Sequence, residues 1–142
     1  MPLFASLLLL VSLGGQTDFG YLAGPSSQAD LDRYPAKRYE LELSKADSAF
    51  DNARDAYVKG DFEKGDAGLE EMTKALDSCL GTLEEAHKSR FYKKAELRVA
   101  NLQRRMTTLL DDIELPKRGW AEQTSRKLED IHDKLLAGVM RK

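Results

Sequence analysis

The sequence contains very few of the residues from which catalytic and metal sites are usually built. Among 142 residues there is one cysteine, Cys79, and there are two histidines, His87 and His132. A single cysteine cannot form an internal disulfide, so no disulfide framework supports the fold. The sequence also has no glycine-rich phosphate loop and no zinc-type spacing of cysteine or histidine. These absences predict a protein that is not an enzyme and has no catalytic, metal-binding or cofactor-binding residues.

A strong net charge is absent as well. The net charge is −2, with 32% charged and 42% hydrophobic residues, which is typical of a folded domain rather than a disordered chain. This balance favours neither a nucleic acid nor a membrane surface as the partner. The alternation of apolar and polar residues that marks β-strands does not occur, so we expect an all-α fold.

The N-terminus carries the longest segment without a charge or a strong helix breaker. Residues 3–13 read LFASLLLLVSL, and eleven residues are too few for a membrane-spanning helix of about 20. Small residues follow at Gly14 and Gly15, so we expect a secretory signal peptide over residues 1–15. No Lys or Arg precedes the run, so only the N-terminal amine supplies positive charge there. The protein is therefore expected to be exported, periplasmic or secreted, with no stable membrane span after cleavage.

The next segment, residues 16–36, is predicted to be a flexible linker. Gly20, Gly24, Pro25 and Pro35 interrupt it, and no helical or strand period survives. The remaining residues, 37–142, are expected to form one helical-bundle domain.

Four apolar stripes with helical spacing occupy this domain. Their members are Tyr39, Leu43, Ala46, Phe50, Ala53 and Tyr57; Phe62, Gly65, Leu69, Met72, Leu76, Leu80 and Leu83; Ala95, Val99, Leu102, Met106, Leu109 and Ile113; and Trp120, Thr124, Leu128, Ile131, Leu135 and Val139. Gly60 should end the first helix and Asp61 should cap the second, while Pro116 should end the third. We therefore predict an antiparallel up-down bundle of four helices.

The boundary between the second and third helices has no glycine or proline to mark it. The stripe shifts phase between Ala86 and Phe91, which favours a turn there, with Ser89 as a capping residue. One long, kinked helix is the alternative reading.

The charges are unevenly distributed between these two helices. Residues 61–86 have a net charge of −6, whereas residues 87–110 have a net charge of +6. We expect the acidic and basic helices to lie side by side and neutralise each other. The alternative is that the basic helix faces outward toward an anionic partner.

One set of residues resembles a metal constellation. Glu84-x-x-His87 and Glu129-x-x-His132, with Glu42 and Glu96, match the ligand count of bundle di-iron proteins. The two motifs would differ in depth by about 15 Å along the bundle, and most of the carboxylates lie off the apolar stripes. We therefore predict no metal site. His132 is expected on the surface, His87 near a helix C-terminus, and Cys79 as a buried thiol, with an intermolecular disulfide as the alternative.

The turn at residues 59–64, Lys-Gly-Asp-Phe-Glu-Lys, resembles the turn inside a tetratricopeptide repeat, a helix hairpin that binds peptides. The resemblance covers one hairpin and departs at Gly65, Met72 and Thr73, where the repeat has alanine, alanine and leucine. No second copy follows at the 34-residue period, and a lone hairpin is expected to offer no groove, so no function is transferred.

The function expected from these features is that of an exported, non-enzymatic helical-bundle protein with an interaction or structural role in the cell envelope. An unknown protein partner or a homodimer is compatible with it. The alternative is a helical sensor or carrier whose metal or ligand site forms on oligomerisation.

Overall fold

The computed structural model describes residues 34–141, and the predicted signal peptide and most of the predicted linker lie outside them. The described residues form four α-helices and one short 3₁₀ turn, without a strand. The helices are α3 (Pro35–Val58), α4 (Phe62–Ala86), α5 (Ser89–Asp112) and α6 (Gly119–Met140), and the 3₁₀ turn η2 (Leu115–Lys117) precedes α6. The all-α helical bundle predicted from the sequence is confirmed. Helix α3 begins at Pro35, two residues before the expected start, because proline suits the first turn of a helix.

The turn between α3 and α4 is formed by the residues predicted for it. Gly60 has φ +83°, a left-handed conformation that glycine adopts without steric cost. The Asp61 carboxylate accepts a hydrogen bond from the backbone N–H of Lys64 at 3.2 Å and so caps the start of α4. This turn closes α3 and α4 into a tight hairpin.

Helices α4 and α5 are separate, so the alternative of one long helix is wrong. Helix α4 ends at His87, which has the left-handed φ of 53° and donates its backbone N–H to the Leu83 carbonyl oxygen. Ser89 is the first residue of α5 and does not cap it; the cap position is occupied by Lys88, whose side chain makes no capping bond. The phase shift in the sequence therefore marks a real break.

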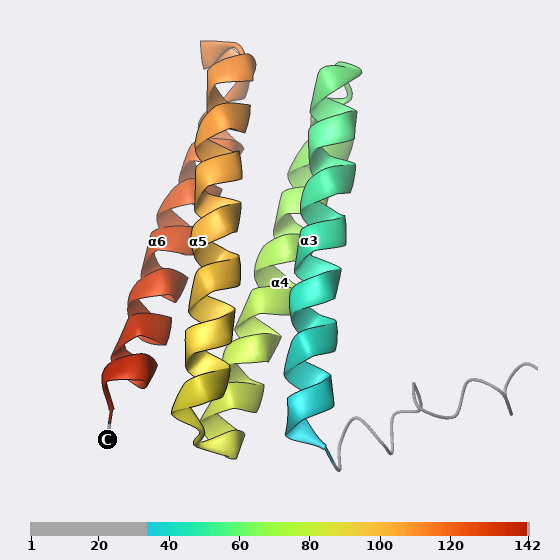
Figure 1. Ribbon diagram of the computed structural model, residues 1–142. Helices are drawn as coiled ribbons and strands as arrows, with labels where there is room; N and C mark the ends of the chain where they lie inside the picture. Colours follow the sequence, from blue (N-terminus) through green and yellow to red (C-terminus); the bar gives the residue numbers. More distant parts are fainter. Residues whose placement is uncertain (1–33, 142) are drawn as a thin grey trace, which may run out of the picture. The chain divides into compact units, whose positions relative to one another are not determined.

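The bundle consists of two hairpins, α3–α4 and α5–α6, which lie beside each other (Figure 1). Contacts of α3 with α5 and of α4 with α6 join them. Because the chain reverses direction at each turn, the two helices within each hairpin are antiparallel. The neighbours from different hairpins, α3 with α5 and α4 with α6, are parallel. No helix within residues 34–141 is long and apolar enough to cross a membrane.

The core is formed by the predicted stripes, except that Phe62 and Val139 are only partly buried and Trp120 is exposed. Every predicted member on α3 and on α5, with Ile113 just after α5, is buried. On α6 the buried residues are Ala121, Thr124, Leu128, Ile131, Leu135 and Gly138. Trp120 is 43% exposed, because the inward-facing series with spacings of three and four begins one residue later, at Ala121.

Close helix contact within the α3–α4 hairpin depends on glycine. A Cβ atom added to Gly68 would lie 2.8 Å from the Ala53 Cβ and 3.0 Å from the Ala53 Cα. The backbones of α3 and α4 therefore approach closely at this point. Gly81, on the same helix, has no heavy atom within 4 Å of such a Cβ.

Candidate functional site

The residues of the suggested metal constellation are not gathered into one site within residues 34–141. Glu84, His87 and Glu129 are exposed, and Glu96 and His132 form a pair between α5 and α6. Glu42 lies between α3 and α4. Within residues 34–141, no group of three or more His, Cys, Asp or Glu side chains could hold a metal ion together.

His132 is not the surface residue that we expected. Its Nε2 lies 2.8 Å from the Glu96 Oε2, and both side chains are about four-fifths buried, with exposures of 20% and 18%. The pair joins α5 to α6 within the second hairpin. Its geometry is that of a structural bond, and within residues 34–141 no further His, Cys, Asp or Glu joins the pair in a group that could hold a metal ion.

Glu42 is the most deeply buried carboxylate among the described residues, with 8% exposure. Its carboxylate accepts hydrogen bonds from the hydroxyls of Ser78 and Thr82, and the Thr82 bond measures 2.7 Å. The Arg38 Nε donates to the Thr82 hydroxyl at 2.9 Å, and Arg38 also pairs with Glu85. These bonds offset the cost of burying the carboxylate, so Glu42 serves to fasten α3 to α4.

Cys79 is buried, as predicted, and its thiol is free. Burial, and then the nearby Glu42 carboxylate, raise the pKa of Cys79 from 9.0 to about 12. The reactive form of cysteine is the thiolate, so this environment suppresses nucleophilic and redox chemistry at neutral pH. The buried position also works against the alternative of an intermolecular disulfide.

The basic helix α5 pairs with α3 rather than with the acidic helix α4, so our expectation of the pairing was wrong. The Lys94 Nζ lies 3.0 Å from the Glu40 Oε1, and Arg98 and Arg105 pair with Asp47 and Asp51. The reason is topological, since α5 lies against α3 and has few contacts with α4. Within the described residues, the only inter-hairpin ion pair on α4 joins Asp77 to Lys127 of α6, at 3.3 Å.

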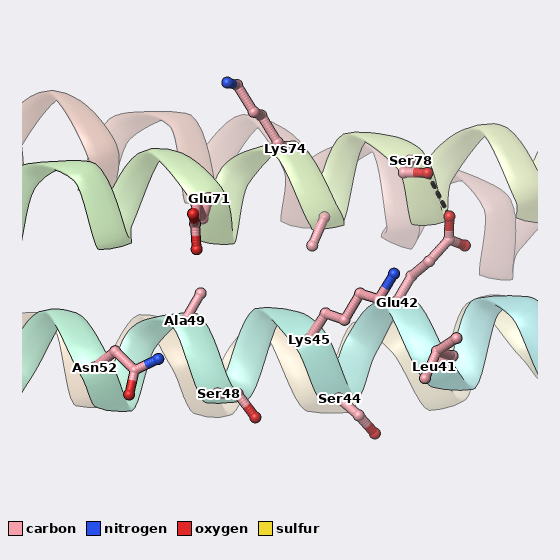
Figure 2. Close-up of a pocket in the computed structure, with 11 residues that line it drawn as sticks. Leu41, Glu42, Ser44, Lys45, Ser48, Ala49, Asn52, Glu71, Lys74 and Ser78 are labelled. Atoms are coloured by element: carbon pink, nitrogen blue, oxygen red, sulfur yellow. Dashed lines mark hydrogen bonds between the residues drawn. The ribbon is translucent and has the colours of Figure 1, made fainter. Parts of the chain in front are cut away.

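A groove of about 600 Å³ lies between α3 and α4. We call it the α3–α4 groove. Figure 2 shows its lining, with Lys45 of α3 and Glu71 of α4 directed toward the space between the helices, and Lys74 directed away. Five of the eleven lining residues are serine or alanine, and the full lining consists of Leu41, Glu42, Ser44, Lys45, Ser48, Ala49, Asn52, Glu71, Lys74, Ala75 and Ser78.

A second hollow of about 420 Å³ adjoins the first and shares Asn52 and Glu71 with it. Together they follow the hairpin from Leu41 to the turn at Lys59, a distance of about 27 Å at 1.5 Å per helical residue. We include this second hollow in the α3–α4 groove. The expectation that a lone hairpin offers no groove is therefore wrong.

Lysines without carboxylate partners line this groove. No Asp or Glu within residues 34–141 forms an ion pair with Lys45, Lys59 or Lys64, whereas Lys74 pairs with Glu70 at 3.5 Å. Glu71 is the only lining carboxylate, apart from the bonded Glu42 and from Asp55 beside Arg54. The lining thus carries four lysines against three carboxylates, so its charge is nearly balanced with a small positive excess, on a hairpin whose second helix is acidic.

No family model, curated protein or solved structure matches the chain.

The sequence indicated the helices of this groove but not the groove itself. Residues such as Ser44, Ser48 and Ser78 lie outside the apolar stripes and carry no motif. The only signal in the sequence was the small size of Ser44 and Ser48, which stand four residues apart on α3. Size alone does not distinguish a groove from an ordinary solvent-exposed face, so the structure was needed to identify it.

Proposed function

We propose that this protein is an exported, non-enzymatic helical-bundle protein that binds a partner protein through the α3–α4 groove. The single observation that carries the proposal is that groove, which extends along the hairpin and is bordered by charged side chains. Export and an envelope or extracellular location are supported by the apolar run at residues 3–13 and the small residues after it.

The bonding of the titratable groups supports a binding role over a catalytic one. Glu42 is held by two hydroxyls, His132 is held by Glu96, and the pKa of Cys79 is raised by burial. Each group therefore stabilises the bundle, and none has the base and orienting partner that a nucleophile requires.

The other exposed cations are less suited to be the main binding surface. Lys94, Arg98 and Arg105 of α5 are already engaged with α3. The remaining α5 cations include Lys93 and Arg104, which line none of the hollows described above. A partner on that side would gain exposed charge contacts without a concave surface, and such contacts are individually worth little.

Two measurements test the proposal. Fractionation of the producing cells, with N-terminal sequencing of the mature chain, should find it outside the cytoplasm and beginning near residue 15 or 16. Affinity capture from envelope extract should then recover a partner with the unaltered protein and with Asn101→Trp, but not with Ser48→Trp. Asn101 and Ser48 are both exposed helix positions, and only Ser48 lines the groove.

A cytoplasmic chain that retains its first residues would contradict the export half of the proposal. Equal capture by both tryptophan variants would contradict the binding half, because a bulky side chain at Ser48 obstructs the rim of the groove without disturbing the buried core.

A further inference from the structure

We infer that the occupant of the α3–α4 groove is an acidic amphipathic helix of a partner protein, with small or medium aliphatic residues on its inner face. This inference rests on the proposed function and adds the chemistry of the partner to it. Three features of the groove carry it: the secondary structure of its walls, the size of its lining side chains and the position of its lysines.

The walls of the groove determine the backbone conformation of the occupant. Both walls are α-helices, whose backbone N–H and C=O groups bond within their own helix. An extended peptide would find no backbone partners in these walls, and its own N–H and C=O groups would depend on lining side chains such as Ser48 and Asn52. A helix satisfies its backbone internally, and the length of the groove corresponds to a helix of about 18 residues.

The lining determines the inner face of that helix. Ala49 and Ala75 are apolar and small, and Ser44, Ser48 and Ser78 add little volume. A third helix can therefore approach closely, and alanine or leucine on its inner face would contact the floor. Larger aromatic residues would hold the helix away from it. The groove therefore fits a partner helix whose inner face presents two aliphatic residues per turn or fewer.

The lysines determine the charge of the partner. Lys45, Lys59 and Lys64 lie along the groove without carboxylate partners among residues 34–141, and Figure 2 shows Lys45 reaching toward the space between the helices. Carboxylates on the flanks of the docked helix would neutralise them. Glu71 and Asp55 also line the groove, so an acidic helix must place its carboxylates beside Lys45, Lys59 and Lys64 and away from these two groups.

The experiment uses two synthetic peptides of about 20 residues as probes. Both have the same alanine and leucine stripe, and the flanking positions are glutamate in one and lysine in the other. Binding to the purified protein is followed by fluorescence anisotropy at low and at physiological salt. We expect the glutamate peptide to bind at least about tenfold more tightly than the lysine peptide, with a preference that weakens as salt rises.

Matched variants distinguish the groove from the general surface. The triple variant Lys45→Glu, Lys59→Glu and Lys64→Glu should lose at least about tenfold in affinity for the glutamate peptide. The control triple variant Lys93→Glu, Arg104→Glu and Lys134→Glu changes the net charge equally at exposed residues without ion pairs in the described chain, and should bind as before.

Three outcomes would overturn the inference. The first is equal binding of the two peptides, or no binding of the glutamate peptide. The second is an equal loss in both triple variants. The third is concentration-dependent self-association of the protein that Ser48→Trp abolishes, since the occupant would then be a second copy. If a partner is captured through the groove but the glutamate and lysine peptides bind equally, the proposed function stands. Only the inference that the partner helix is acidic is then refuted.

Discussion

Replacing Gly81 and Gly68 by alanine should change the stability of the bundle in opposite directions. Both residues lie within α4, where alanine is favoured over glycine by about 1 kcal/mol. At Gly81 an added Cβ meets no heavy atom within 4 Å, so Gly81→Ala should gain that amount. The melting temperature should rise by about 4 °C for a domain of this size.

At Gly68 the added Cβ would lie 2.8 Å from the Ala53 Cβ and 3.1 Å from its backbone nitrogen. Ordinary contact requires α3 and α4 to separate by several tenths of an ångström, and such overpacking costs about 1–3 kcal/mol. After the propensity gain, Gly68→Ala should change stability by between zero and a loss of about 2 kcal/mol. The two variants should therefore differ by about 1–3 kcal/mol.

Urea unfolding followed by far-ultraviolet circular dichroism measures this difference directly, provided that the slopes of the transitions agree. Equal stabilisation by the two variants would refute the close contact of α3 and α4, and with it the geometry of the groove that they form. Gly138→Ala provides an independent check in the other hairpin, where the added Cβ would lie 2.1 Å from the Tyr92 Cδ1.

Three further expectations concern single groups. The Tyr92 hydroxyl is buried without a hydrogen-bond partner among the described residues, so Tyr92→Phe should leave stability unchanged or raise it by about 1 kcal/mol; a loss of that size in urea unfolding would show that the hydroxyl is bonded. Above pH 9 the unfolded thiol of Cys79 has lost its proton, whereas the native thiol, with its pKa of about 12, retains it. Stability should therefore fall by about 1.4 kcal/mol per pH unit from this group, and Cys79→Ala should reduce the slope of stability against pH between pH 9 and 12. An unchanged slope would mean that the thiol is not desolvated. For the pair of Arg98 and Asp47, a double-mutant cycle with alanine should give a coupling of about 0.5–1 kcal/mol that decreases in high salt, and zero coupling would show that the pair adds nothing to stability.

The sequence predicted the helices well because their determinants are local. Gly60, Asp61 and Pro116 act through the backbone conformation and hydrogen bonding of their own turns, and the turns occur where they stand. The apolar stripe of α5 was correct at each position, since a period of 3.6 residues fixes one face of a helix without reference to its neighbours. Trp120 was assigned to the core because it stands four residues before Thr124, whereas the buried series reaches Thr124 from Ala121, three residues before it.

The sequence predicted the contacts between helices less well because these depend on which helices are neighbours. The opposite charges of α4 and α5 suggested direct pairing, yet Arg98 and Arg105 reach Asp47 and Asp51 of α3. His132 and Glu96 are 36 residues apart, and only the packing of α5 on α6 brings them together. The groove was missed for the same reason. It is formed jointly by α3 and α4, and lining residues such as Ser44, Ser48 and Ser78 are not part of the apolar stripe of either helix.

The central claim is that the α3–α4 groove is the surface through which the protein acts. The most direct test is photo-crosslinking in the producing cells, with a photoreactive phenylalanine analogue at Ser48 in the groove or at Asn101 on α5. We predict a discrete adduct with one partner from position 48, reduced by the lysine-to-glutamate triple variant of the groove, and none from position 101. Equal adduct patterns from the two positions, or no adduct from position 48, would contradict the claim.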